Sequence, residues 1–150
     1  LKGVDFGGAQ RPISSHLDII DLDLVDYYKR PVKFNSLSQI GHELDFIFSS
    51  HTFEHIPNLD DILVEIYDAL KVGGKLIVNL PSYTCVRWRA NNGIDMGGTP
   101  HVHTFKLSKT NVEEEINNLR DIDTLLENHG FKVSLAEYAG DNNIILIVEK

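Results

Sequence analysis

The chain has 150 residues, of which 42% are hydrophobic and 24% are charged, so we expect one globular domain over residues 1–150 rather than a disordered or fibrous chain. Its 14 Lys and Arg residues against 22 Asp and Glu residues give a formal net charge of −8, which repels phosphate backbones and anionic membranes and disfavours a nucleic-acid partner. Cys85 is the only cysteine, and no apolar run approaches the length of a membrane helix, which excludes an internal disulfide and favours a cytoplasmic location.

The first half of the chain contains short apolar segments separated by polar and glycine residues. These segments predict four strands, at residues 3–6, 17–22, 32–34 and 44–49. Gly7 and Gly8 follow the first strand directly and predict a tight turn. Because this strand starts with the chain itself, without an initiating methionine or a signal peptide, we expect N-terminal helices of the complete protein to be missing.

The second half combines two helical patterns with three strands. Apolar residues at helical spacing predict a helix over 58–71, between a proline and a glycine pair. A second period of about 3.6 residues predicts a helix over 112–126, which Gly130 ends. The remaining strands are predicted at residues 75–80, 131–138 and 143–149. A turn rich in Gly and Asn joins the last two strands and is typical of a hairpin.

This order of elements predicts the fold class. Strands that alternate with helices and then end in a hairpin indicate a three-layer α/β/α sandwich around a Rossmann-like, mostly parallel sheet of seven strands, with a C-terminal antiparallel hairpin. Ligands of such sheets bind outside the carboxyl ends of the strands. The long irregular segment from Ser82 to Thr104 follows a central strand, so we expect a mobile functional loop there.

Several stretches of the sequence resemble one known family. The most specific covers residues 44–81, in which a strand, a helix, a glycine turn and a second strand match the family almost residue by residue. Further matches are the acidic glycine turn GVDFGGA at residues 3–9 and the C-terminal segments PHVHTF and LLENHGFKV. Through them the sequence resembles the class I S-adenosylmethionine-dependent methyltransferases, in particular their type 11 domains. The resemblance implies S-adenosylmethionine as the cofactor.

The resemblance also implies a set of cofactor-binding residues. In the family, the glycine turn after the first strand approaches the methionine part of the cofactor, and here Ala9 replaces its last glycine. Asp21, with Asp23 as a rival, corresponds to the carboxylate that binds the ribose hydroxyls, and Asn35 corresponds to a residue beside the adenine amino group. The expected cofactor-binding residues are Asp5, Gly7, Gly8, Asp21, Asn35, Ser36, Ser50 and His51.

Histidines are the candidates for catalysis. His51 begins the pattern H-x-x-E-H, which an inverted class of zinc proteases also uses, but here it follows a strand, and we interpret Glu54 and His55 as residues that brace a turn. His101 and His103 alternate, so on an extended segment both would face one side. Two histidines alone make a weak metal site, and no metal is assigned. The expected bases toward an acceptor hydroxyl are His51, His101 and His103.

Arginines in the irregular segment stand out in an acidic protein. Arg87 and Arg89 suit an acceptor that carries phosphate or carboxylate, unless they pair with carboxylates of the chain itself. Tyr83 completes the expected substrate-binding set. The sequence thus predicts methyl transfer to an oxygen or nitrogen atom of a small, anionic acceptor. Two alternatives remain: an inactive cofactor-binding or partner-binding module of this fold, and a nicotinamide-dependent enzyme, although the G-x-G-x-x-G turn is missing. The oligomeric state is not predicted.

Overall fold

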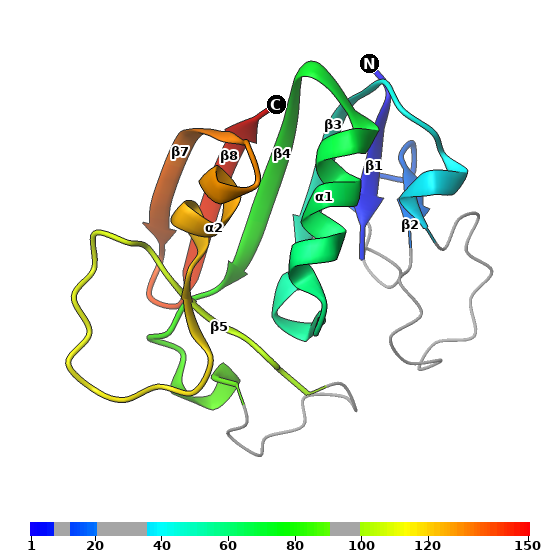
Figure 1. Ribbon diagram of the computed structural model, residues 1–150. Coiled ribbons are helices and arrows are strands. Elements are labelled where there is room, and N and C mark those ends of the chain that lie inside the picture. Colours follow the sequence, from blue (N-terminus) through cyan, green and yellow to red (C-terminus); the bar gives the residue numbers. More distant parts are fainter. Residues whose placement is uncertain (8–12, 21–35, 91–99) are drawn as a thin grey trace.

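Six strands form the central sheet of the computed structural model, which describes residues 1–7, 13–20, 36–90 and 100–150. The strands are β1 (Gly3–Phe6), β2 (Asp18–Ile20), β3 (Leu44–Ser50), β4 (Leu70–Pro81), β7 (Lys132–Ala139) and β8 (Asn143–Glu149). Their order across the sheet is β2-β1-β3-β4-β8-β7 (Figure 1). The pairs within the first four strands are parallel, whereas β8 runs antiparallel to both β4 and β7.

Two helices, three short 3-10 turns and a small second sheet complete the described structure. They are α1 (Leu59–Ala69), α2 (Ile122–Asn128), η1 (Leu37–Gln39), η2 (Phe53–His55), η3 (Val86–Trp88), β5 (Thr104–Lys106) and β6 (Leu119–Asp121). The strands β5 and β6 pair with each other in parallel. Figure 1 shows α1 and α2 in front of the same face of the central sheet.

The mixed α/β class and the mostly parallel sheet are confirmed, with differences in detail. The terminal hairpin is present, since β7 pairs antiparallel with β8 from Lys132 opposite Glu149 to Ala139 opposite Asn143. The sheet has six strands rather than the predicted seven among the described residues, and the strand predicted at 32–34 lies outside them. Both described α-helices cover one face, so the described part of the chain shows two layers of the predicted three.

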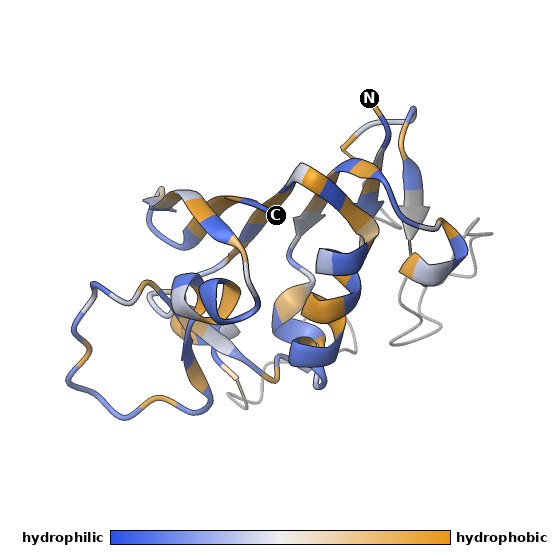
Figure 2. Ribbon diagram, turned by 45° about the horizontal axis from the view of Figure 1, so that its top comes forward, coloured by the Kyte–Doolittle hydropathy of each residue, from blue (hydrophilic) through white to orange (hydrophobic). Residues whose placement is uncertain are grey.

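Apolar side chains between the helices and the sheet form the core. Along α1 the residues Leu59, Leu63 and Ile66 are each 0% exposed, whereas Val64 is 52% exposed. The helix therefore turns one apolar stripe toward the sheet, and Figure 2 shows hydrophobic and hydrophilic residues around it. Alternate residues of β4 and β8 are buried on the same side, as the two-residue period of strands requires. None of the described helices has the length and apolar character that crossing a membrane needs.

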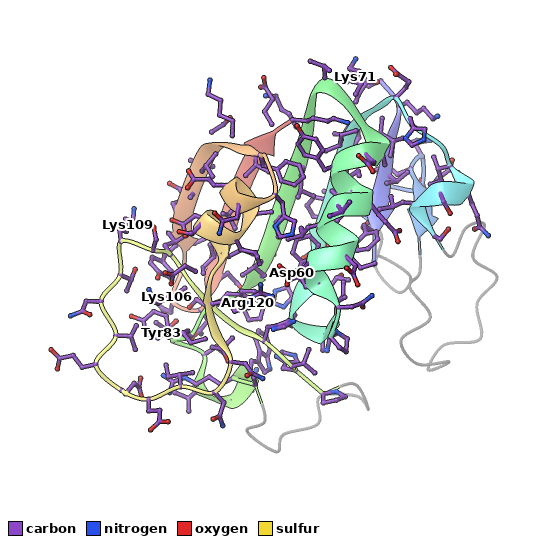
Figure 3. All side chains as sticks on the ribbon, in the orientation of Figure 1. Asp60, Lys71, Tyr83, Lys106, Lys109 and Arg120 are labelled. Atoms are coloured by element: carbon purple, nitrogen blue, oxygen red, sulfur yellow. The ribbon has the colours of Figure 1, made fainter. Side chains whose placement is uncertain are left out.

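The helix predicted over 112–126 is wrong in its first half. The chain is helical only from Ile122 to Asn128, and β6 takes the preceding residues. Asn118 has a φ of +49°, a left-handed conformation that breaks an α-helix. Its backbone oxygen accepts a hydrogen bond from the backbone N–H of Thr104 at 3.1 Å. An ion pair of 2.9 Å between Arg120 and Asp60 then ties β6 to the start of α1 (Figure 3).

Candidate active site

The turn after β1 packs directly on the turn after β3. The two strands pair in parallel, with Phe6 opposite Ser49. Gly7, the residue after β1, has a φ of +88°, which favours glycine. A Cβ atom added to Gly7 would lie 2.1 Å from Oγ1 of Thr52. The strand ends therefore meet through a contact that only glycine allows.

Asp5 is the buried acidic residue of β1. Asp5 is only 1% exposed, and its Oδ2 accepts a hydrogen bond of 2.7 Å from the backbone N–H of Ile13. Burial raises the pKa of Asp5 above its usual value of 3.8, and the hydrogen bond from Ile13 opposes that rise. A carboxyl group thus lies at the strand end to which the resemblance assigns the cofactor.

The other predicted cofactor-binding residues divide into two groups. Three of them lie outside the described residues: Gly8, Asp21 and Asn35. Ser36 precedes η1, and its hydroxyl is hydrogen-bonded to the hydroxyl of Ser38 at 2.7 Å. Ser50 ends β3, and its hydroxyl accepts a hydrogen bond of 3.2 Å from the side-chain amide of Asn79 on β4. His51 follows directly and has a φ of +51°.

The short turn η2 buries the carboxyl group of Glu54 at this end of the sheet. Glu54 is 0% exposed, and neither of its carboxyl oxygens has a hydrogen-bond partner among the described residues. Its Oε1 lies 3.6 Å from Nδ1 of His51 and 3.8 Å from Nε2 of His55. The interaction with Glu54 raises the pKa of His51 above its usual 6.5, although burial acts in the opposite direction.

The segment that carries the last two candidate histidines folds back onto η2. The backbone N–H of Val102 donates a hydrogen bond of 2.7 Å to the backbone oxygen of Glu54. This contact brings His101 against His55, with ring centroids 4.4 Å apart. Nδ1 of His101 donates a hydrogen bond of 2.6 Å to the backbone oxygen of Trp88. Burial lowers the pKa of His101 below its usual value.

His103 has different partners from His101, although the sequence pattern predicted a shared side. Its Nε2 donates a hydrogen bond of 2.8 Å to the backbone oxygen of Ile56, and its ring packs near Phe105. Burial lowers the pKa of His103 as well. The buried Nδ1 of His103 has no partner among the described residues. Of the two imidazole rings, only that of His101 joins the group around the Glu54 carboxyl, although the backbone N–H of His103 donates to the backbone oxygen of Glu54 at 3.2 Å.

The predicted substrate-binding residues lie around η3 and differ in what holds them. Both terminal nitrogens of Arg89 donate to the carboxylate of Glu114, at 3.0 and 2.7 Å, and its Nε donates to the backbone oxygen of Tyr83 at 2.7 Å. Arg89 thus pairs with a carboxylate of the chain itself. Arg87 is exposed, and its guanidinium carbon lies 5.0 Å from the ring centroid of Trp88. No ion pair joins Arg87 to another residue of the described ranges.

The site contains polar residues to which the sequence reasoning gave no ligand role. Glu54, Trp88 and Asn143 each carry a buried side-chain atom without a partner among the described residues. The rings of Trp88 and His51 meet edge to face at 5.3 Å, and Asn143 interacts with His51. The H-x-x-E-H pattern was a signal for Glu54. Trp88 stands out in the sequence between Arg87 and Arg89, but no local pattern marks Asn143, and only the fold brings the two residues to His51. Buried polar atoms that have no partner among the described residues need an explanation, such as a bound water, an ion or a catalytic role.

Comparison with known proteins gives matches to methyltransferases. Residues 20–78 match the family described as methyltransferase domain. No curated protein is significantly similar in sequence. Among solved structures, an S-adenosylmethionine-dependent methyltransferase from Mesorhizobium loti has a TM-score of 0.61 at 12% identity, over 100% of this chain and 91% of that chain.

Two further structures agree with this match. A putative S-adenosylmethionine-dependent methyltransferase from Listeria monocytogenes has a TM-score of 0.57 at 15% identity, over 99% of this chain and 90% of that chain. A possible histamine N-methyltransferase from Thermotoga maritima has a TM-score of 0.64 at 12% identity, over 99% of this chain and 82% of that chain. Residues 20–78 thus match a methyltransferase family, and the whole chain shares the fold of S-adenosylmethionine-dependent methyltransferases. Both findings support S-adenosylmethionine as the cofactor.

Proposed function

We propose that the chain transfers the methyl group of S-adenosylmethionine to an oxygen or nitrogen atom of a small anionic acceptor. The observation that carries this proposal is the direct packing of Gly7, after β1, on Thr52, after β3. This packing brings the end of β1, with Asp5 and Gly7, next to the turn that carries His51, Glu54 and His55. A cofactor and an acceptor held on these two sides would meet at the carboxyl ends of neighbouring strands, where ligands of such sheets bind.

The residues at the end of β1 fit the cofactor. Gly7 has no side chain between its backbone and a ligand, and Asp5 offers a buried carboxyl group. We assign cofactor contacts to Asp5, Gly7, Gly8, Asp21, Asn35, Ser36, Ser50 and His51. The bound cofactor supplies a methyl group already activated by its sulfonium, so the protein has mainly to hold and orient the two reactants.

On the acceptor side, Arg87 and Arg89 have separate roles. Arg87 is exposed and has no carboxylate partner among the described residues, so its guanidinium is available to a phosphate or carboxylate of the acceptor. Arg89 is held by Glu114 and by the backbone of Tyr83, so we assign to it the positioning of η3. Tyr83 then contributes to the acceptor side through its position in the same loop.

His51 is our first choice of base for a hydroxyl acceptor. Glu54 stabilises the protonated form of its ring, which is the form that results when His51 accepts a proton. His101 and His103 remain neutral more readily, because burial lowers their pKa. Both are hydrogen-bonded to backbone oxygens, which fixes their ring orientation and suits them to positioning.

Calorimetric titration with S-adenosylhomocysteine tests the cofactor half of the proposal. Asp21→Ala should weaken binding by about 1.5–3 kcal/mol, the value of hydrogen bonds to a charged group, which is roughly 10- to 150-fold in Kd. Asp23→Ala is the matched control, since it removes a carboxylate two residues away. Loss in Asp23→Ala alone would transfer the ribose contact to Asp23. No binding by the wild-type chain would refute the proposed function.

Methyl transfer from labelled S-adenosylmethionine to a panel of small carboxylates and phosphates tests the acceptor half. Arg87→Ala should raise KM for the accepted compound at unchanged cofactor affinity. Lys109→Ala is the control, because Lys109 is also an exposed cation (Figure 3). Tight cofactor binding without transfer to any acceptor would instead support the inactive module, and transfer to uncharged acceptors alone would refute the role of Arg87.

A further inference from the structure

The side chains of Glu54, His55 and His101 bring potential metal-ligand atoms together near His51. Glu54, His55 and His101 each offer one such atom, and these atoms all lie within 4.8 Å of one another. Glu54 and His55 come from η2, whereas His101 lies in a distant segment of the chain, just before β5. The group is therefore assembled by the fold and not by sequence proximity alone.

Backbone oxygens orient both histidine rings for such a role. Nδ1 of His101 lies 2.6 Å from the backbone oxygen of Trp88, and Nδ1 of His55 lies 3.3 Å from that of Pro100. A carbonyl oxygen can only accept, so Nδ1 is the donor in both rings and the lone pair of the neutral imidazole is on Nε2. Histidines that bind metals are held in this way, with the other ring nitrogen donating to a carbonyl or carboxylate.

Glu54 supplies an independent indication that this group can bind a cation. Its residue is 0% exposed, and both carboxyl oxygens lack a hydrogen-bond partner among the described residues. Burying a charged carboxylate without a partner is costly. The nitrogens of His51 and His55 lie 3.6 and 3.8 Å away, beyond ordinary hydrogen-bond distance. A cation between the carboxylate and the histidines would remove this cost.

We propose that Glu54, His55 and His101 bind a divalent first-row transition-metal ion of the Zn²⁺ class. Two imidazoles and one carboxylate favour such an ion over Mg²⁺ or Ca²⁺, which prefer oxygen ligands. Zinc–nitrogen distances of about 2.0–2.1 Å correspond to ligand atoms roughly 3.4 Å apart in a tetrahedral site, so the present group contracts on binding. Three protein ligands would leave one position of a tetrahedral site open. This inference does not depend on methyl transfer.

Titration of the full, metal-free chain with Zn²⁺, and with Co²⁺ as a spectroscopic probe, tests the site. We expect one ion per chain and visible absorption of bound Co²⁺. His101→Asn and Glu54→Gln should each weaken binding by at least about 100-fold, since even residues that only support ligands contribute about 10–100-fold. The matched controls are His42→Asn and Glu65→Gln. They replace an exposed histidine and an exposed glutamate outside the site, so they should keep the wild-type affinity for Zn²⁺.

Two further measurements distinguish a loss of metal binding from a loss of folding and from a loss of cofactor binding. Circular dichroism and thermal melting without metal should show both site variants folded. Glu54→Gln should melt no lower than the wild-type chain, because it removes a buried carboxyl group that has no hydrogen-bond partner among the described residues. If the site variants bind Zn²⁺ as tightly as the wild-type chain, the proposed site is wrong. Mg²⁺ competing equally with Zn²⁺ would overturn the metal class. S-adenosylhomocysteine affinity is measured in parallel, so that a failure of the metal site and a failure of the proposed function are distinguishable.

Discussion

The contact between Gly7 and Thr52 makes a quantitative prediction for Gly7→Ala. An alanine at a φ of +88° costs about 1–2 kcal/mol of backbone strain. The added Cβ would also lie 2.1, 2.5 and 2.8 Å from three side-chain atoms of Thr52, an overlap that costs about 1–3 kcal/mol. The sum of about 2–5 kcal/mol lowers Tm by roughly 4–20 °C for a domain of this size. Thermal unfolding followed by circular dichroism measures the change.

Gly41→Ala is the matched control for this prediction. Gly41 has a φ of +84°, and a Cβ there would meet nothing within 4 Å. It therefore reports the strain alone, about 1–2 kcal/mol or roughly 2–8 °C. In the Gly7→Ala background, Thr52→Ala removes the two nearest contacts and should recover part of the loss, a coupling that a double-mutant cycle measures. Equal losses for Gly7→Ala and Gly41→Ala, with no coupling to Thr52, would refute the close packing of the two turns.

Two further predictions concern the buried residues of the sheet and helix. Asp5→Asn should be more stable than the wild-type chain at neutral pH. Burial raises the pKa of Asp5 in the folded state, so the free energy of unfolding of the wild-type chain falls as the pH rises from the usual pKa of 3.8 through the raised pKa. Urea unfolding should therefore give similar free energies of unfolding for the two chains below pH 3.8. A gap that widens on acidification would contradict this sign. Ile66→Ala should cost about 2–5 kcal/mol because Ile66 is 0% exposed, whereas Val64→Ala, at a site 52% exposed, should stay within about 0.5 kcal/mol; similar losses at both sites would refute the described face of α1.

Local patterns predicted the elements whose periodicity continues through the whole element. The helix expected over 58–71 is α1 at Leu59–Ala69, and the strand expected at 143–149 is β8 with the same bounds. The helix expected over 112–126 failed because a long-range contact overrides the pattern. Asn118 adopts φ > 0 and its neighbours pair with β5, which is an interaction between distant parts of the chain.

The candidate site was predicted unevenly for the same reason. Gly7 and Asp5 were readable, because a glycine turn after an acidic strand is a local pattern. The partner of Arg89 was not readable, since Glu114 lies 25 positions away and could be any of many carboxylates. The H-x-x-E-H pattern singled out Glu54 without showing that its carboxyl group is buried and has no hydrogen-bond partner among the described residues. Burial depends on the segment around His101 folding back, which no local pattern indicates.

The buried polar residues gather at one end of the central sheet. Those in the described ranges are Asp5, Ser49, Thr52, Glu54, Ser82 and Thr104. Each lies in or just after the carboxyl-terminal part of β1, β3 or β4, except Thr104, whose hydroxyl accepts from the backbone N–H of Ala90 after η3. The opposite part of the sheet is packed with apolar side chains under α1 and α2. Of this set, Ser49 and Glu54 have side-chain oxygens without a hydrogen-bond partner among the described residues. Because unpaired buried polar groups weaken a fold, we expect replacement of these two to gain stability, and to do so at the expense of binding if a ligand occupies this end of the sheet.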